Sequence, residues 1–312
     1  MLRFLLRRLL IVPPTLLVVV TLAFFMMRAA PGSPFTADRK LTPEIERNVM
    51  ARYGMDRPLM TQYLGYLGGV VRGDLGPSLK YKDKPVMAVI AQGFPKSLTI
   101  GLSALVLAVG AGISLGTLAA LRQNQGLDHA AMSLAVLGVC VPTFVTAPLL
   151  VLVFASWLGW LPTAGWPGAG QGLGGVRYLV LPVAVLALPQ IAVISRLTRA
   201  GMIEVLRSNY VRTARARGLP ERTVVFRHAL RAALLPLVSY LGPACAGLIT
   251  GSLVVEQIFQ LPGLGKSFVT GALQRDYTVV MGVVILYAGL ILLLNLAADL
   301  LYAALDPRVR LG

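Results

Sequence analysis

Charged side chains are scarce in this chain of 312 residues, where Asp, Glu, Lys and Arg together make up 13%. Soluble domains carry about 25% charged residues. Hydrophobic residues make up 56% of the chain, and its mean hydropathy is +0.73. A water-soluble globule of this size could not hide so much apolar surface. The scarcity of charge therefore argues against a soluble enzyme or a disordered protein, and it predicts a membrane protein that crosses the bilayer several times.

Cysteine and histidine are also scarce, with two of each. Cys140 and Cys245 lie inside apolar runs, which is typical of small buried hydrophobes, so no disulfide scaffold is indicated. His129 and His228 lie in polar connections without Cys or His neighbours at ligand spacing. We therefore expect neither a metal site nor a cofactor.

Uncharged stretches predict an all-α integral membrane protein with six transmembrane helices, since about 20 residues span a bilayer. They lie within residues 9–27, 97–121, 130–158, 178–195, 232–255 and 277–298. The first could also be a signal peptide, but it exceeds the usual apolar core of about 7–15 residues, so we expect a retained helix. The second carries glycines at which neighbouring helices can approach closely: Gly101, Gly110, Gly112 and Gly116.

The predicted organisation is a first helix within residues 1–30, an extracytoplasmic loop region at 31–96, and a core of five further helices in 97–312. The short loops that share a side with the N-terminus hold 15 Lys and Arg, against three in the two short loops opposite. Basic loops stay in the cytoplasm, so we expect both termini to be cytoplasmic. The loop 31–96 does not weigh against this, because loops longer than about 60 residues translocate regardless of charge.

One string resembles a catalytic motif. Residues 263–267, Gly-Leu-Gly-Lys-Ser, end like a phosphate-binding loop. That motif needs a glycine where Gln260 stands, and it needs a preceding strand. The string also falls in a loop expected outside the cell, away from ATP. We expect no nucleotide site here and, without a nucleophile, base or metal constellation elsewhere, no enzyme.

Asp299 supports an alternative from another class, a proton-coupled secondary carrier. It directly follows the last predicted span, 277–298, at the end expected near the cytoplasm. Intramembrane acids often mark proton relays, but such relays usually contain more than one titratable group.

The most informative loop is residues 196–231, with nine Arg and two Glu. Helical spacing places Tyr210, Val211 and Ala214 on one face of a first short helix. Asn209 can cap the start of this helix, and Gly218 with Pro220 can end it: Gly favours the left-handed C-terminal position and Pro cannot continue a helix.

A second amphipathic run follows, with an apolar side made of Val225, Phe226, Ala229 and Leu230. The loop is therefore predicted to form two short helices joined at Gly218. Such a basic hairpin could lie on anionic lipid. It could equally dock a cytoplasmic protein, and periodicity leaves both open.

A resemblance to a known family favours docking. The segments Y-V-R-T-A-R-A-R-G-L-P (210–220) and H-A-L-R-A-A-L-L-P (228–236) resemble the coupling loop of permease subunits of ATP-binding-cassette (ABC) importers, in the dipeptide/oligopeptide/nickel branch. Further matches are P-G-S-P (31–34), G-D-L-G-P-S (73–78), R-L-T-R (196–199), L-P-G-L-G (261–265), R-D-Y (275–277) and L-Y-A-A-L-D-P (301–307). Residues 78–83 and 202–208 are most similar to the first permease subunit of oligopeptide importers.

The resemblance implies a type I importer permease in a bacterial inner membrane that moves oligopeptides. It implies four partners: a second permease, two cytoplasmic ATPases that hydrolyse the ATP, and an extracytoplasmic peptide-binding protein. An importer of dipeptides, nickel or another small solute is the alternative within the family. The residues 199–233 correspond to the coupling loop. Its ATPase-contacting residues would be Tyr210, Arg212, Thr213, Ala214, Arg215, Ala216, Arg217, Gly218, Leu219 and Pro220.

One position departs from the general importer signature, which reads Glu-Ala-Ala and then Gly after three residues. Here the triplet is Arg212-Thr213-Ala214. The contact that the Glu makes in the general signature therefore cannot be assigned to Arg212, which must have a different role.

Overall fold

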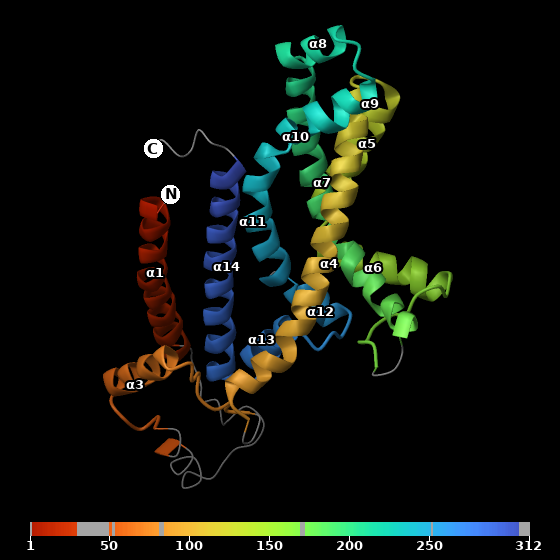
Figure 1. The fold of residues 1–312 in the computed structure, drawn as a ribbon. Coiled ribbons are helices and arrows are strands. Elements are labelled where there is room, and N and C mark those ends of the chain that lie inside the picture. Colours follow the sequence, from red (N-terminus) through yellow and green to blue (C-terminus); the bar gives the residue numbers. More distant parts are fainter. Residues whose placement is uncertain are drawn as a thin grey trace. The chain divides into compact units, whose positions relative to one another are not determined.

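The computed structural model describes residues 2–29, 50–51, 54–80, 84–168, 172–250 and 252–305. This part of the chain is helical apart from loops and one isolated β-bridge between Pro77 and Pro85 (Figure 1). The α-helices are α1 (Leu2–Ala29), α3 (Leu59–Val71), α4 (Val86–Leu121), α5 (Gly126–Cys140), α6 (Thr143–Leu150), α7 (Arg177–Leu206), α8 (Asn209–Ala216), α9 (Glu221–Thr223), α10 (Leu230–Ala233), α11 (Leu235–Thr250), α12 (Leu253–Ile258), α13 (Leu264–Leu273) and α14 (Tyr277–Leu305). Two π-helical segments, Val151–Trp157 and Val224–Ala229, and one 3-10 segment, Gly172–Val176, complete the set.

The predicted spans are confirmed with one correction. Five helical stretches are long and apolar enough to cross a membrane, and a sixth candidate is the bent pair Gly126–Cys140 and Thr143–Trp157. We predicted a single helix over 130–158, but these two halves meet at 107°. Pro142 explains the break, because it disfavours a helical conformation for the residue before it, and Val141 is extended at φ −86° and ψ 117°.

The Arg-rich loop is shorter than predicted. We placed its start at Arg196, but α7 continues to Leu206. Between Arg196 and Leu206 the residue that most disfavours a helix is Gly201. A single Gly lowers helix stability by only about 1 kcal/mol, so the helix continues through it. The first arginine therefore marks the end of the apolar stretch, whereas the helix itself ends ten residues later, at Leu206.

The chain divides into two compact units. The first unit contains residues 98–261 and 293–312, and the second contains residues 2–97 and 262–292. Both α4 and α14 contribute residues to each unit.

In the first unit, three of the four predicted glycines do lie at close helix contacts. A Cβ on Gly116 would lie 2.4 Å from the carbonyl oxygen of Ser195, and one on Gly112 would lie 2.7 Å from Ile194 Cβ, so α4 and α7 touch at backbone distance. Gly101 meets Ile249 of α11 at 3.1 Å in the same way, whereas Gly110 faces open space. Small residues permit this approach, which gains van der Waals contact that lipid tails cannot replace.

The second unit begins with α1 packed on α3. Phe24 is 1% exposed, and its ring centroid lies 5.5 Å from that of Tyr63. The hydroxyl groups of Tyr63 and Thr21 are hydrogen-bonded at 2.8 Å. A separate apolar cluster joins the start of α4 to α13 and α14 through Leu75, Val86, Ile90, Leu264, Val279 and Val283.

A buried carboxylate organises the polar connection of this unit. Asp276 is fully buried immediately before α14 and accepts a hydrogen bond from the Val279 amide at 3.3 Å, as a helix N-cap does. It also accepts bonds from the Ser78 hydroxyl and from the amides of Leu79 and Lys80 at 3.2 Å and 3.3 Å. A single side chain therefore holds residues 78–80 against the start of α14.

Candidate functional site

The ten residues predicted to contact a partner form α8 and the turn after it. We call residues 208–233 the hairpin, since α8 runs one way and the segment from α9 through Val224–Ala229 to α10 follows a turn. Within the first unit, α8 and α9 lie at one end of α7 (Figure 1). The two-helix structure predicted from the sequence is confirmed.

An apolar cluster attaches the hairpin to its own unit. Val211 of α8 is fully buried and Ala214 is 8% exposed. They pack with Met202 of α7 and with the second arm of the hairpin. The buried members are Ala120, Met202, Val211, Ala214, Val224, Val225, Ala229 and Ala233. We call this set the hairpin cluster; it ties the position of α8 to that of α7.

The other face of α8 is open. Arg212, Thr213, Arg215, Ala216 and Arg217 are all exposed. Tyr210 is 48% exposed, so its predicted place on the buried face beside Val211 is wrong. It precedes Val211 by one position, and residues one apart on a helix do not share a face.

The turn has the geometry that the sequence predicted. Gly218 has φ +75°, a left-handed conformation that glycine adopts without strain. Its amide donates to the carbonyl of Arg215 at 2.9 Å, which closes the end of α8. Pro220 precedes α9 with φ −62°. Leu219 is 37% exposed at the tip.

The predicted cap at Asn209 is wrong. Ser208 is the residue before α8, and its hydroxyl donates to the carbonyl of Val205 at 2.6 Å instead of capping α8. Because α7 ends at Leu206, only a two-residue connection separates the helices. The short link lets Ser208 close α7.

Phe226 is 60% exposed, although the helical pattern predicted it on the apolar side of the second arm. The reason is the π-helical stretch Val224–Ala229. A π-turn holds more residues than an α-turn, so side chains after it leave the 3.6-residue register. Exposed Phe226 and Tyr210 therefore add aromatic surface to a basic hairpin.

An ion pair closes the turn, and the sequence did not single it out. Arg215 donates to Glu221 through Nη2 and Nε at 2.6 Å and 3.1 Å. The hydrogen bond from Arg215 lowers the pKa of the Glu221 carboxyl below its ordinary value, and the same bond raises the pKa of Arg215. Both side chains are largely exposed. The pairing occupies one of the arginines on the outer face.

A second ion pair that the sequence analysis missed joins α5 to α7. Asp128 of α5 is 1% exposed and accepts two hydrogen bonds from Arg199 of α7, at 2.6 Å and 2.7 Å. It also accepts from the amide of Asn124 at 2.9 Å. Bidentate pairing fixes orientation as well as distance. The sequence does show an acid in the first turn of α5 and an arginine in α7. Sequence spacing alone cannot show that these two residues form a pair.

The Gly-Leu-Gly-Lys-Ser string does not form a phosphate-binding loop. Helix α12, which ends at Ile258, precedes it where a strand is required. Leu264 and Gly265 are buried, and the amide of Leu264 donates to Ser97 Oγ at 2.9 Å. Across the described residues, no group of three His, Cys, Asp or Glu could hold a metal ion.

Comparisons with known proteins agree over nearly the whole length. Residues 112–311 match the family described as "Binding-protein-dependent transport system inner membrane component", and residues 1–103 match the N-terminal family of the same systems. The chain is 52% identical over 310 residues to the oligopeptide transport system permease protein OppB of Salmonella typhimurium and to that of Escherichia coli; each alignment covers 99% of this chain and 100% of the relative.

The dipeptide transport system permease protein DppB of Bacillus subtilis is 43% identical over 311 residues, covering 100% of this chain and 99% of the relative. Among solved structures, the methionine ABC transporter MetNI in inward-facing conformations is similar with a TM-score of 0.60 at 18% identity, over 72% of this chain and 99% of the other. A structure of an amino acid ABC transporter with histidines gives a TM-score of 0.52 at 16% identity, over 71% of this chain and 94% of the other. At these identities the structures show the shared fold alone.

Proposed function

Because the chain belongs to the family of binding-protein-dependent transport system inner membrane components, we propose that it is a permease subunit of an ATP-driven oligopeptide importer. It forms half of the translocation pathway in the inner membrane. The observation that supports oligopeptides as the cargo is the 52% identity, over 99% of the chain, to oligopeptide permeases. Relatives named for dipeptides are less similar, at 43%.

The proposed partners follow from this role. Two cytoplasmic ATPase subunits hydrolyse ATP, a second permease completes the pathway, and an extracytoplasmic binding protein delivers the peptide. Under this proposal the hairpin and both termini face the cytoplasm. The proposed ATPase subunits carry out the hydrolysis, so the free energy enters through the contact with them.

The hairpin is suited to that contact in two ways. Its outer face offers Tyr210, Arg212, Arg217 and Phe226 to a partner, all exposed. Its inner face is held by the hairpin cluster, whose members Met202 and Val211 are fully buried. A force applied to the outer face then moves α7 with it, because packed interiors transmit displacement instead of deforming. Closure of the ATPase dimer thus becomes a rigid-body movement of the spans.

The test is reconstitution. The tagged chain, purified from its own membrane, should bring two ATPases and a second permease with it. In proteoliposomes, uptake of a labelled oligopeptide should need the binding protein and ATP on the hairpin side, and it should survive collapse of the proton gradient. Transport by the purified chain alone would refute the proposal.

Two alternatives are separated by the same preparation. If only dipeptides or nickel chelates are taken up, the proposed oligopeptide cargo is wrong, but the role as an importer permease remains. A proton-coupled carrier acting through Asp299 is not favoured, because the family match and the 52% identical relatives belong to binding-protein-dependent or oligopeptide transport systems. Under that alternative an uncoupler stops uptake, and Asp299→Asn does the same.

A further inference from the structure

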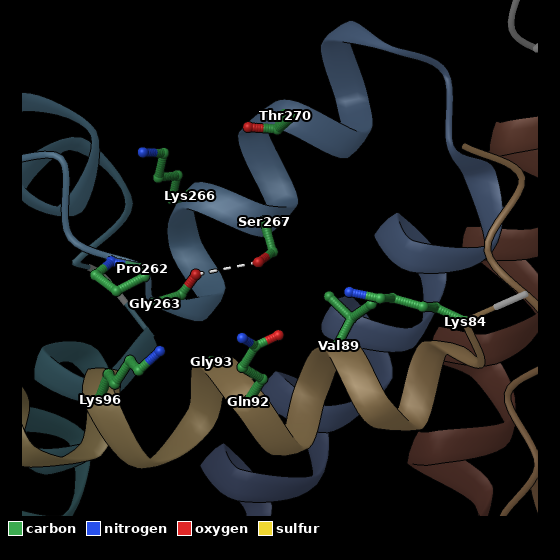
Figure 2. A pocket seen from close by; sticks show the side chains of 10 residues that line it. All are labelled: Lys84, Val89, Gln92, Gly93, Lys96, Pro262, Gly263, Lys266, Ser267 and Thr270. Atoms are coloured by element: carbon green, nitrogen blue, oxygen red, sulfur yellow. Dashed lines mark hydrogen bonds between the residues drawn. The ribbon is translucent and has the colours of Figure 1, made fainter. Parts of the chain in front are cut away.

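Three residues of the Gly-Leu-Gly-Lys-Ser string, Gly263, Lys266 and Ser267, line a groove in the second unit. The groove measures about 300 Å³ and lies between the first turns of α4 and the helix α13 (Figure 2). Its lining residues are Lys84, Val89, Gln92, Gly93, Lys96, Pro262, Gly263, Lys266, Ser267 and Thr270.

The two walls are matched rows of side chains. On α4 the lining positions follow i, i+3, i+4 and i+7 from Val89 to Lys96, and on α13 the same spacing runs from Gly263 to Thr270. The walls are held together at Gly93, where a Cβ would lie 3.1 Å from Leu264 Cδ2 and 3.2 Å from the Gly263 carbonyl carbon. The Ser97 hydroxyl, which accepts from the Leu264 amide, locks the same contact. The groove is therefore a formed feature of this unit.

Three ammonium groups border the groove and no lining residue is acidic. Figure 2 shows Lys84 and Lys96 at opposite ends of the α4 row with Gln92 between them, while Lys266 and Ser267 stand on α13. The structure pairs neither Lys84 nor Lys96 with any acidic side chain that it describes. Ammonium, amide and hydroxyl donors together suit an anion with carboxylate-like oxygens.

The lining decides between two sources of such an anion. A lipid headgroup would bring acyl chains, but the only large apolar side chains here are Val89 and Pro262. The groove also lies in the first turns of a 36-residue helix, of which about 20 residues span a bilayer. The later part of α4 is the uninterrupted apolar one, so these first turns reach toward water. A soluble partner fits better than a lipid.

We propose that this lysine groove is a docking site for an acidic side chain of the extracytoplasmic binding protein. The inference rests on the proposed function, which places the groove on the side where that protein arrives. Complementary charge at such a site raises the rate of encounter and fixes the register of the two surfaces.

The experiment uses the whole complex in nanodiscs of zwitterionic lipid, with its cognate binding protein immobilised for binding kinetics. The double variant Lys84→Glu/Lys96→Glu should bind about tenfold more weakly, mostly through slower association, because like charges now face each other. Raising the salt concentration should weaken the wild type more than the variant. Lys84→Arg/Lys96→Arg should retain near-normal affinity. The matched control is Arg72→Glu, an exposed cation of the same unit outside the groove, which should change affinity by less than about twofold.

Reciprocal charge reversal on the binding protein identifies the partner side chain. One Glu→Lys or Asp→Lys exchange there should restore association with the double variant. If the double Glu variant fails to assemble, Lys84→Gln/Lys96→Gln provides the same comparison without repulsion, with a smaller expected loss of about threefold.

Three results would overturn the inference. If wild type and variants bind the binding protein with equal affinity, in a complex that still co-purifies its ATPases, the lysine groove is not the docking site. The proposed importer role is then unaffected. Loss of retained anionic lipid without loss of binding-protein affinity would identify a lipid headgroup as the occupant. A wild-type chain that co-purifies no ATPases and binds no binding protein would overturn both the inference and the proposed function.

Discussion

Two polar segments of this chain are held in place by opposite means. The hairpin, at residues 208–233, is anchored by an apolar cluster of eight buried residues. In residues 78–80, three hydrogen bonds converge on one carboxylate, that of Asp276. Apolar packing distributes the anchoring free energy over many contacts, whereas hydrogen bonding concentrates it in one acceptor. Under the proposed function the hairpin carries force to the spans and keeps its outer face free for the ATPases, and the first arrangement suits that role better.

Asp276→Ala should give the largest effect. It leaves the Ser78 hydroxyl and the amides of Leu79 and Val279 without their acceptor, and each buried unsatisfied group costs about 1–3 kcal/mol. We expect a total loss of roughly 3 kcal/mol or more and rapid hydrogen exchange at residues 78–80. Thermal unfolding of the purified complex measures the first quantity.

The control for this prediction is Asp74→Ala. Asp74 is exposed and accepts one bond, from the Gly76 amide at 2.9 Å. If both variants lower the unfolding temperature equally, Asp276 is not a concentrated anchor and the contrast between the two segments fails.

Val211→Ala should come second. The side chain is fully buried in the hairpin cluster, and removing its two methyl groups costs about 2 kcal/mol. The remaining cluster keeps the hairpin folded, so exchange at residues 209–216 should increase only partly. Its neighbour Tyr210 is the matched control. Tyr210→Ala should leave stability within about 0.5 kcal/mol and weaken ATPase co-purification instead. The reverse pattern would mean that the two faces of α8 are misassigned.

Gly218→Val tests the turn itself. No atom lies within 4 Å of the position that its Cβ would take, so the penalty comes only from the left-handed backbone, about 1–2 kcal/mol. We expect normal insertion, altered docking of the ATPases, and reduced peptide uptake per assembled complex. If uptake per complex stays normal while abundance falls, Gly218 acts only as a cap and has no coupling role.

The smallest effect should come from the ion pair across the turn. The pKa of Glu221 is lowered by Arg215, so the pair stabilises the turn above the ordinary pKa of a Glu, near 4.5, and this contribution is lost as the pH falls through the lowered value. At an exposed site it amounts to less than about 1 kcal/mol. Exchange rates at residues 217–223, compared between wild type and Glu221→Gln, should converge at acidic pH. A difference that persists at acidic pH would show that the carboxylate charge is not responsible.

Much of the site could be predicted from the order of residues. Gly218 and Pro220 mark a turn because only local backbone conformation decides it. The glycines at 101, 112 and 116 were sound indications of helix contact, since a missing side chain can be seen in the sequence. Gly110 shows the limit of that argument, because which neighbour stands opposite a glycine is not a local property.

Two of the three errors in the hairpin have a common physical cause. Phe226 was assigned to a buried face from 3.6-residue periodicity, but a π-helical stretch changed the register. Tyr210 was assigned to the face of Val211, although residues one apart on a helix do not share a face. Asn209 was assigned a capping role that depends on where α7 ends. The errors at Asn209 and Phe226 depend on where a helix ends or changes type, and contacts with other parts of the chain decide this.

The sequence by itself determined the membrane class, most of the spans and the basic hairpin with its glycine turn, and its motifs carried the resemblance to the family. Hydrophobicity, charge and backbone conformational preference act residue by residue, so they can be read from the chain without a structure. Only the tertiary structure decided the 107° break within the third predicted span, the pairing of Asp128 with Arg199, the network around Asp276 and the lysine groove. Except for the break, which follows from Pro142, these features join residues distant in sequence, through hydrogen bonds and packing that exist only once the helices have met.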